Sequence, residues 1–273
     1  MDGGVRASIP YNAPMKIASW NVNSLKVRMP HLTEWLAEAK PDVVALQETK
    51  LEDAKFPVDE LAAAGYRAVF SGQKTYNGVA LLARADTHEG FEDVVTDIPN
   101  LDDPQRRILA ATIGGVRVVD LYVVNGKAVG DEKYVYKLDW LAKMREFLAR
   151  EIERHPRLVV LGDFNIAPDD RDVYDPVAWG EDILCSPPER EALKHITDLG
   201  LHDSFRLFEQ GGEHFSWWDY RQGAFRRNMG LRIDLILIGD ALKSAATTAG
   251  IDRTPRKWER PSDHTPVTVD LDI

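Results

Sequence analysis

Short, almost wholly apolar runs alternate along the chain with longer segments in which apolar residues recur every three or four positions. The short runs predict buried β-strands at residues 15–23, 43–46, 78–83, 116–124, 158–162, 231–238 and 265–271. The helical spacing predicts helices over residues 29–39, 133–153 and 188–199. Strands without a polar face, separated by helices, are typical of sheets covered by other layers. The pattern therefore predicts an α/β fold built in layers.

The same pattern favours one domain over residues 15–273. A chain of 273 residues is within reach of a single large core, and no Gly- or Ser-rich linker interrupts its middle. Residues 1–14 lack the apolar segment of a signal peptide, and we expect them to be an extension outside the fold. Two segments, KIASWNVN (16–23) and VVLGDFNI (159–166), echo each other weakly, which two related halves with facing sheets would explain.

Composition narrows the function classes. The 34 basic and 44 acidic side chains give a net charge of −10, which excludes a uniformly basic coat for nucleic acid but allows a local basic face. Cys185 is the only cysteine, so an intramolecular disulfide and a cysteine-based zinc site are excluded. No apolar run approaches the ~18 residues of a membrane span. We expect a soluble, cytoplasmic protein.

Carboxylate, amide or imidazole side chains end, interrupt or directly precede several of the predicted strands. These side chains are Asn21, Asn23, Glu48, Asp163, Asn165, Asp234, Asp263 and His264. Each has an ordinary alternative when taken alone, such as a turn residue, a solvated loop charge or a local cap. For Asp234, inside an apolar run, the alternative is an ion pair with Arg232 or another base. Together they form a hard, oxygen-rich ligand set that suits Mg²⁺ or Mn²⁺ rather than zinc.

Such a set suits hydrolysis of phosphodiesters. A divalent ion neutralises the phosphate and stabilises the oxygen that leaves. The carboxylate of Asp163 could align and deprotonate the attacking water. His264, held by Asp234, could donate to a phosphate oxygen as negative charge builds. Tyr122, near the end of its predicted strand, could hydrogen-bond a phosphate or could be an ordinary strand aromatic.

Nine short motifs occur in a fixed order from about residue 15 to the end of the chain, and together they indicate a protein family. They are SWNVNSL (19–25), DVVALQETK (42–50), GVALL (78–82), QRRIL (105–109), LYVVNG (121–126), GDFNIAP (162–168), FSWWDYR (215–221), NMGLRIDLIL (228–237) and PSDHTPV (261–267). In these motifs the chain resembles the exonuclease III class of apurinic/apyrimidinic (AP) endonucleases, in the endonuclease/exonuclease/phosphatase superfamily. The resemblance implies a four-layered α/β sandwich, with two facing mixed β-sheets flanked by helices. It also implies Mg²⁺-dependent incision of duplex DNA 5′ to abasic sites, with 3′–5′ exonuclease and 3′-phosphodiesterase activity.

The resemblance also implies a role for each polar strand end. By position, Glu48 corresponds to the principal metal ligand, with Asn21, Asn23 and Asp263 near it. In some descriptions of the family, the ligands of a second or moving ion correspond to Asp163, Asn165 and His264, so one ion and two both stay open.

The catalytic roles are carried over in the same way. Asp163 corresponds to the residue that activates water or transfers a proton, and Asn165 to a transition-state stabiliser. Tyr122 and His264 correspond to phosphate-contacting catalytic residues, and Asp234 to the partner that orients the histidine.

Basic and aromatic residues cluster in segments that flank these motifs. Residues 221–232 hold four arginines and no acidic residue, and Lys127, Lys133 and Lys137 follow the Tyr122 strand. Such loops around a metal-loaded centre could hold a DNA backbone, and an apolar slot could accept a flipped abasic sugar. The expected DNA-binding residues are Asn23, Asn125, Lys127, Trp217, Trp218, Arg226, Arg227 and Arg232. The alternative is that the aromatics belong to the core and the arginines to a solvated face.

Three other functions are alternatives to an AP endonuclease: a non-DNA phosphoesterase, a non-catalytic DNA-binding protein and a serine hydrolase. A phosphatase or phosphodiesterase of the same superfamily, acting on a non-DNA phosphoester, would share the catalytic set. A non-catalytic DNA-binding protein would need a broken site, and here the set is complete. A serine hydrolase is excluded by the absence of G-x-S-x-G. The expected partner is double-stranded DNA with abasic sites or 3′-blocked ends. We expect a monomer associated with the nucleoid through DNA.

Overall fold

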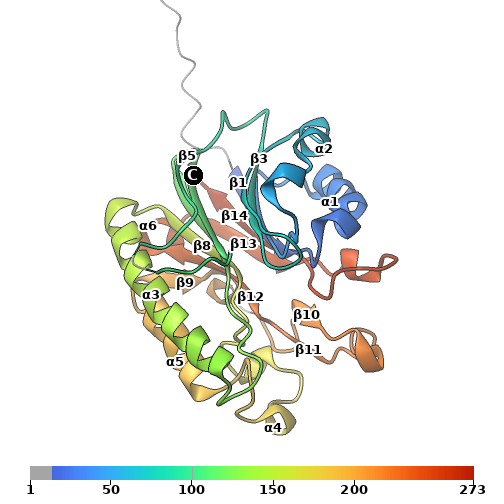
Figure 1. The fold of residues 1–273 in the computed structure, drawn as a ribbon, viewed down its shortest axis with the longest axis vertical. Helices are drawn as coiled ribbons and strands as arrows, with labels where there is room; N and C mark the ends of the chain where they lie inside the picture. Colours follow the sequence, from blue (N-terminus) through green and yellow to red (C-terminus); the bar gives the residue numbers. More distant parts are fainter. Residues whose placement is uncertain (1–13, 100, 209) are drawn as a thin grey trace, which may run out of the picture.

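The computed structural model describes residues 14–273 except 100 and 209, and two facing six-stranded β-sheets form its centre (Figure 1). The first sheet has the order β13-β14-β1-β2-β4-β3, with bounds Ala246–Ile251, Val267–Asp272, Pro14–Asn21, Val43–Gln47, Val79–Arg84 and Tyr66–Ser71. The second has the order β5-β6-β7-β8-β12-β9, with bounds Glu92–Val95, Ile108–Ile113, Val116–Tyr122, Leu158–Asp163, Asp234–Gly239 and Leu201–Asp203. The expected extension over residues 1–14 lies outside the described residues, except that Pro14 is the first residue of β1.

The two sheets repeat one pattern of strand directions. In the first sheet only β1 and β2 are parallel, and in the second only β7 and β8 are parallel. On both sides of each parallel pair the neighbouring strands are antiparallel. The two segments that echo each other in the sequence belong to β1 and β8, which occupy matching places. Both sheets are mixed, as the resemblance implies.

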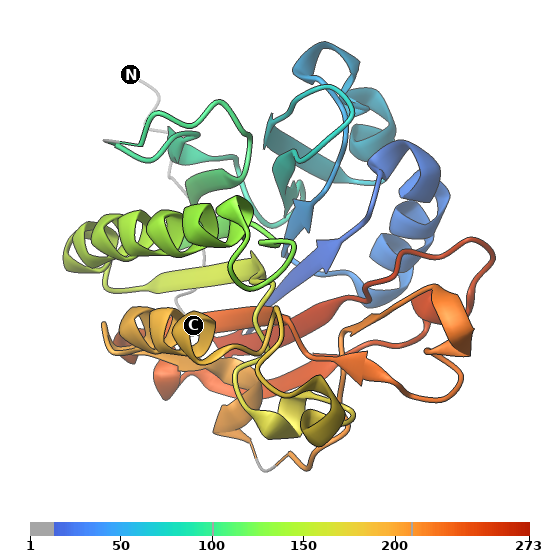
Figure 2. The same cartoon turned by 60° about the horizontal axis from the view of Figure 1, so that its bottom comes forward.

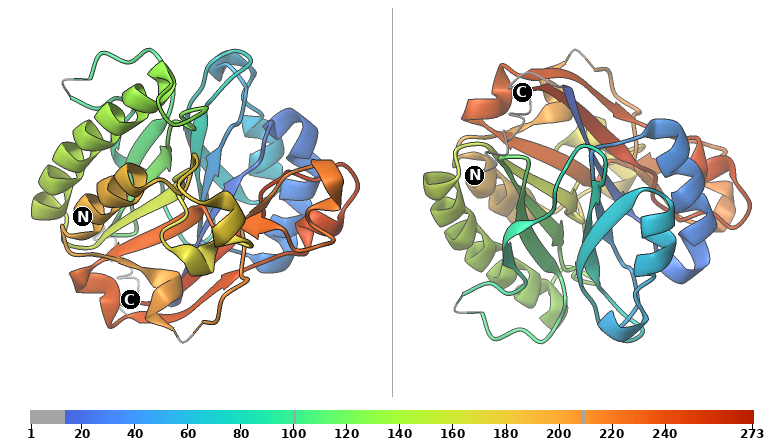
Figure 3. Two further views of the ribbon diagram at one scale, coloured as in Figure 1. Left: turned by 90° about the horizontal axis from the view of Figure 1, so that it is seen from below. Right: turned by 90° about the horizontal axis from the view of Figure 1, so that it is seen from above.

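Helices cover the outer face of each sheet, so the molecule has four layers (Figure 3). Helix α1 (Leu25–Ala39) and helix α2 (Val58–Ala63) pack on the first sheet, where their apolar residues share a cluster with β1, β2 and β4. Helix α3 (Glu132–Arg154) and helix α5 (Pro187–Thr197) pack on the second sheet. Two single-turn helices, α4 (Pro176–Trp179) and α6 (Asp240–Lys243), lie in connections. This confirms the predicted four-layered sandwich.

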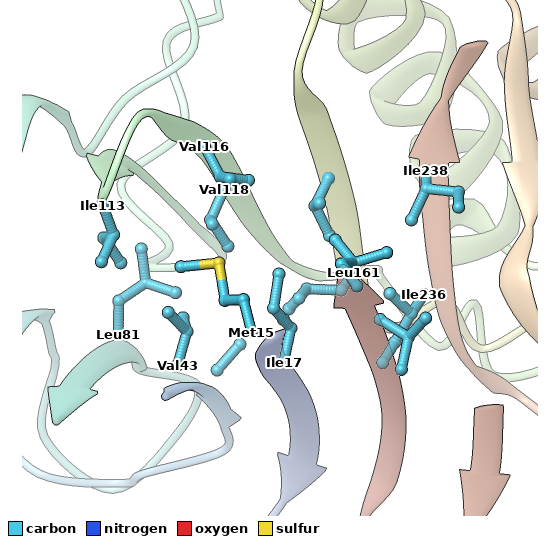
Figure 4. Close-up of a cluster of buried hydrophobic side chains, with 14 of the residues drawn as sticks. Met15, Ile17, Val43, Leu81, Ile113, Val116, Val118, Leu161, Ile236 and Ile238 are labelled. Carbon is cyan, nitrogen blue, oxygen red and sulfur yellow. The ribbon is translucent and has the colours of Figure 1, made fainter. Parts of the chain in front are cut away.

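A hydrophobic core fills the space between the sheets (Figure 4). Its members come from alternate positions of the central strands, as expected where side chains point to opposite faces in turn. Ile17, Val43, Val118, Leu161 and Ile236 are examples, and each is at most 3% exposed. Because polar residues replace apolar ones only at one end of these strands, that end differs chemically from the rest of the interior.

Two predicted elements differ from the observed ones. The helix expected over residues 29–39 begins at Leu25, and Pro30 lies inside it rather than at its start. The strand expected over 231–238 is two strands, β11 (Gly230–Leu231) and β12. Between them the backbone N–H of Arg232 donates to the carbonyl of Asp172, so it leaves the ladder. Strand β11 pairs instead with β10 (Trp217–Trp218) in a separate ribbon.

Within the described part of the chain, no helix is both long and apolar enough to cross a membrane.

Candidate active site

The polar strand ends meet at one edge of the space between the two sheets, where Figure 2 looks onto the loops that surround them. In the second sheet Tyr122, Asp163 and Asp234 stand in register on three neighbouring strands. In the first sheet Asn21 ends β1, and Glu48 directly follows β2. Since both parallel pairs end at this edge, residues far apart in the sequence come together there.

Hydrogen bonds join the two sheets at this edge. The side-chain amide of Asn21 donates to Oε1 of Glu48 at 2.9 Å and to Oδ2 of Asp163 at 3.0 Å. The hydroxyl of Tyr122 donates to Oε1 of Glu48 at 2.8 Å. Glu48 thus receives hydrogen bonds from both sheets, and its second oxygen lies 3.0 Å from Nζ of Lys50.

A carboxylate orients the histidine. Nδ1 of His264 lies 2.9 Å and 3.0 Å from the two oxygens of Asp234. The hydroxyl of Ser216 donates to Asp234 at 2.6 Å and accepts from its backbone N–H, so the carboxylate is itself held. Nε2 of His264 then points at Asp163, 3.7 Å from Oδ2. The alternative pairing of Asp234 with Arg232 is wrong, because His264 takes that place.

The donor set fits a divalent cation. Ligand atoms of Glu48, Asp163 and His264 all lie within 4.8 Å of one another. The neighbouring amide of Asn165 donates to Asp163 at 3.3 Å and to the carbonyl of Val123 at 3.0 Å. Two carboxylates this close together offer the hard oxygen ligands that suit Mg²⁺ or Mn²⁺.

Asp263 joins the site through a second set of contacts. It accepts from the amide of Asn23 at 2.9 Å and from the indole N–H of Trp217 at 3.0 Å. Asn23 in turn accepts from Lys50 at 2.5 Å, and its own N–H donates to Oδ1 of Asn21 at 3.0 Å. Glu48 and Asp263 are therefore on one connected network rather than at opposite ends of the molecule.

Three residues of the site have left-handed backbone conformations. The φ angles are 43° for Asn23, 52° for Glu48 and 49° for Asn165. Asparagine tolerates this region, but glutamate seldom adopts it. Such conformations persist where surrounding contacts enforce them, and they concentrate at functional sites.

Burial and neighbouring charge shift the acid–base groups. Burial raises the pKa of Asp163, and the nearby His264 opposes that rise. Burial alone would lower the pKa of His264, but the carboxylates of Asp234 and Asp163 outweigh it and the pKa lies above its ordinary value. For Tyr122, burial and then the charge of Glu48 raise the pKa of the phenol, which stays a proton donor. Burial opposes ionisation of Asp263, yet His264 and two donated hydrogen bonds hold its pKa low.

The expected DNA-binding residues divide into a surface group and a buried group. Asn125, Lys127, Arg226 and Arg227 are exposed around the edge that carries the site, and Asn23 and Trp217 are partly exposed within it. Asn125 also donates to Oδ1 of Asn165 at 3.2 Å.

Two residues of that set are corrected by the structure. Arg232 is 1% exposed, because its guanidinium is held by Asp172 at 2.6 Å and Asp203 at 2.7 Å. Trp218 is fully buried against Phe215 and Ala224. Both support the loops beside the site instead of presenting a surface to DNA.

Lys137 is corrected as well. It does not join Lys127 and Lys133 in a basic surface, because its side chain is fully buried in an ion pair with Glu189. Its Nζ also donates to the carbonyls of Asn165 at 2.7 Å and Asn125 at 3.2 Å. Lys137 therefore connects the loop that carries Asn125 with the loop that carries Asn165, and stabilises both from the interior.

The loop pair over residues 216–231 and 252–262 lies side by side at the edge of the site, in orange and red in Figure 2. Arg253 stacks over Trp218 and Phe225, with 5.1 Å from its guanidinium carbon to each ring centre. Trp217 packs at the border of a compact apolar cluster whose core members are at most 5% exposed. They are Ala167, Val173, Leu184, Cys185, Leu231 and Ile233.

Lys50 and Ser216 belong to two of the sequence motifs but are functional residues that the sequence alone does not indicate. Lys50 is the last residue of LQETK, directly after Glu48 and Thr49, and Ser216 is the serine of FSWW. The contact of Ser216 with Asp234, 18 positions away, appears only once the chain is folded. Lys50 lies beside the nearby Glu48 and also donates to Asn23, 27 positions away.

The fold and the site define a metal-assisted phosphoester hydrolase. The chain belongs to the Endonuclease/Exonuclease/phosphatase family, whose model matches residues 18–264. It is similar to Exodeoxyribonuclease III of Haemophilus influenzae, with 35% identity over 94% of this chain and all of that protein.

Solved structures show the same relationship. A 3′ phosphatase, NExo from Neisseria, bound to a product DNA hairpin, is 48% identical with a TM-score of 0.92. An AP endonuclease from Archaeoglobus fulgidus is 36% identical with a TM-score of 0.89. Each match covers 95% of this chain and all of the other. The chain is thus a hydrolytic DNA repair nuclease of the exonuclease III class, as its motifs indicate.

Proposed function

We propose that the protein hydrolyses phosphoesters of duplex DNA at abasic sites, on the 5′ side, and at 3′-blocked ends, with Mg²⁺ as its cofactor. The observation that carries this proposal is the convergence of Asn21, Glu48, Tyr122, Asp163 and His264 from two sheets onto one point. Mn²⁺ has the same ligand preferences and should replace Mg²⁺. When bound, the ion neutralises charge on the phosphate and stabilises the oxygen that leaves.

The residues that would hold the ion are Glu48 first, with Asn21, Asp163, Asn165 and Asp263 around it; His264 would join them only in its neutral form, because a protonated imidazole has no lone pair for an ion. Glu48 is 18% exposed in its side chain and opens towards solvent, whereas Asp163 is almost fully buried. Substrate phosphate therefore approaches from the side of Glu48, and Asp163 lies on the protein side of it.

Proton transfer falls to the buried groups. Asp163, whose pKa is raised by burial, aligns the attacking water and accepts its proton. His264, kept protonated by Asp234, donates a hydrogen bond to a phosphate oxygen where negative charge develops. Tyr122, whose hydroxyl donates to Glu48 in this structure, is a second donor for the phosphate, and the amide of Asn165 beside Asp163 is a third.

The exposed basic and amide side chains around the edge bind the DNA backbone. Arg226 and Arg227 lie on the 216–231 loop, and Lys127 with Asn125 lies on the loop after β7. Asn23 and Trp217 lie beside Asp263 and contact the nucleotide at the scissile phosphate. Contacts of this kind position DNA without reading its sequence.

A second candidate is an enzyme confined to 3′ ends. Two observations favour it. The relative with 48% identity is described as a 3′ phosphatase. The apolar cluster beside Trp217 is packed against itself, with core members at most 5% exposed, whereas a flipped abasic sugar needs an open slot.

One comparison separates these activities. The purified protein is given three substrates in Mg²⁺: a duplex with one abasic site, a nicked duplex with a 3′-phosphate, and an intact duplex. Incision of the abasic duplex together with release of phosphate from the nicked duplex supports the full proposal. Release of phosphate without incision of the abasic duplex supports the enzyme confined to 3′ ends. Cleavage of a soluble inositol phosphate but of no DNA substrate would instead favour a non-DNA phosphoesterase. EDTA should stop turnover, and added Mg²⁺ should restore it.

The monomeric state and a cytoplasmic, nucleoid-associated location stay predictions. Sedimentation of the pure protein with and without duplex DNA tests the first.

A further inference from the structure

One buried carboxyl group near the active site has no role in the chemistry proposed above. Asp120 lies on β7 between the sheets and is fully buried. Its Oδ1 accepts a hydrogen bond of 2.7 Å from the amide of Gln47. Its Oδ2 has no hydrogen-bond partner among the residues that the structure describes.

A carboxyl group in an apolar core destabilises the fold when it is ionised. An ionised carboxylate buried without a cation is strongly disfavoured, so the group takes up a proton instead. Burial raises the pKa of Asp120 well above its ordinary value, with the Gln47 hydrogen bond opposing. A neutral acid at this point also avoids adding a negative charge beneath Glu48 and Asp163.

The contacts of Gln47 show which part of the site Asp120 supports. Its amide nitrogen also donates to the hydroxyl of Ser19 at 3.0 Å, so Gln47 is held from both sheets. Ser19 and Asp120 come two residues before Asn21 and Tyr122 on the same strand faces, and Gln47 comes directly before Glu48. The three residues therefore lie one step beneath three residues of the site.

Glu48 needs such support more than its neighbours do. Strand β2 ends at Gln47, and Glu48 continues in a left-handed conformation. The apolar core packs the strands only below this level. The tie between Gln47 and Asp120 is the buried hydrogen bond that connects the end of β2 with β7, the strand of Tyr122.

We propose that Asp120 is a positioning residue that acts through Gln47: together with Ser19 it fixes the end of β2, and so sets the position in which Glu48 meets the metal ion and accepts the hydrogen bond of Tyr122. The inference rests on the proposed role of Glu48 as a metal ligand. Residues that orient a ligand from behind typically change metal affinity about 10- to 100-fold when they are replaced.

The test compares metal affinity with stability. Asp120→Ala removes the acceptor, and Asp120→Asn keeps both the shape and the acceptor without a titratable group. Val118→Ala is the matched control, because Val118 lies two residues earlier on the same face of β7 and belongs to the hydrophobic core. Gln47→Met is a second disrupting variant of similar length, in case Asp120→Ala fails to fold. Mn²⁺ dissociation constants are measured by electron paramagnetic resonance on folded protein, and unfolding temperatures by circular dichroism.

We expect Asp120→Ala and Gln47→Met to weaken Mn²⁺ binding about tenfold or more, and Asp120→Asn to stay within about twofold of the parent. Val118→Ala should unfold at a lower temperature with unchanged affinity. The positioning role is overturned if both disrupting variants bind Mn²⁺ as Val118→Ala does. Glu48→Gln distinguishes a failure of the proposed metal site from a failure of the positioning role of Asp120. If this variant leaves Mn²⁺ affinity unchanged, the metal site itself is misplaced.

Discussion

The amide of Asn21 at the end of β1 donates a hydrogen bond of 3.0 Å to the carboxylate of Asp163 at the end of β8. The residues are 142 positions apart and belong to opposite sheets. The site is therefore built by the way the two halves face each other, and not by either half alone. Substitutions that keep the shape of these side chains should change the chemistry while leaving the fold intact.

Asp163→Asn tests the proposed base. The amide keeps the size of the side chain and an acceptor oxygen, but it takes no proton from water. We expect single-turnover cleavage of DNA to fall at least ~10²-fold, within the usual range for a lost general base. DNA affinity, measured by fluorescence anisotropy, should change only a few-fold. Asp169→Asn, on a partly exposed loop residue paired with Arg171, is the control. Unchanged cleavage in the Asp163 variant removes that residue from its role.

Asp234→Asn tests the orientation and charge of His264. Asp234 is the strongest of the groups that raise the pKa of His264, so its neutralisation lowers that pKa. The imidazolium is then lost at a lower pH, and the alkaline limb of the rate profile moves to lower pH. Burial and charge leave the pKa of His264 at about 10 in the parent, so rates measured from pH 6 to about 10.5 check this shift. Asp240→Asn is a matched control, because Asp240 pairs with His202 at the surface. An alkaline limb that does not move contradicts the assignment.

Lys137→Met tests the buried ion pair. Its removal leaves Glu189 fully buried without its cation, and breaking such a pair typically costs ~3–5 kcal/mol in free energy of unfolding. Burial lowers the pKa of Lys137, and the charge of Glu189 opposes that fall without cancelling it. Lys133→Met, at an exposed position on the same helix, should change stability by less than about 0.5 kcal/mol. Urea unfolding followed by fluorescence measures both, and equal effects would show that the buried pair does not stabilise the fold.

Gly162→Ala tests the strand end that carries Asp163. A Cβ atom at this position would lie 1.9 Å from the carbonyl oxygen of Leu121, with φ at +139°. The parallel strands β7 and β8 would have to separate where Tyr122 and Asp163 are in register. We expect an unfolding temperature lower by several degrees and little activity. Gly211→Ala, where no atom lies within 4 Å of the added group, is the control. A stable, active Gly162→Ala protein is incompatible with this close approach.

The surface and buried arginines should behave differently. Replacing Arg226 and Arg227 together by alanine should reduce the slope of log affinity against log salt by up to ~1.8, since each phosphate contact contributes about 0.9. Stability should not change. Arg232→Met should instead lower stability, because Asp172 loses a buried partner. Titrations of duplex DNA at several salt concentrations measure the slope. A reduced slope in Arg232→Met with normal stability would restore Arg232 to the DNA-binding surface.

Much of the fold was predictable because its central strands are nearly continuous apolar runs. The end of VVLG predicts where Asp163 lies, and the observed strand β8 ends at that residue. The edge strands β3, β5, β9 and β13 were missed, and so was the buried strand β6. Strand β5 is four residues long with three of them exposed, so its sequence lacks a core face. Its pairing with β6 depends on the neighbouring strand instead of on its own pattern.

The roles of charged residues near the site were harder to predict than the strands, because the sequence does not show which oppositely charged residue each of them will contact. Arg232 looks like a member of a basic segment, yet Asp172 and Asp203, 60 and 29 positions away, enclose it. Lys137 follows the helical spacing of a surface residue but meets Glu189 from a different helix. By contrast Asp234 and His264 could be paired in advance, because a carboxylate inside an apolar strand needs a polar partner.

The central claim is that Glu48 and its neighbours hold a divalent cation at the junction of the two sheets. Anomalous diffraction from crystals grown with Mn²⁺ tests it most directly. We expect the strongest peak within about 2.5 Å of a carboxylate oxygen of Glu48, at a ligand distance typical of hard cations, and no such peak in Glu48→Gln crystals. A well-occupied peak elsewhere, with none beside Glu48, would contradict the account.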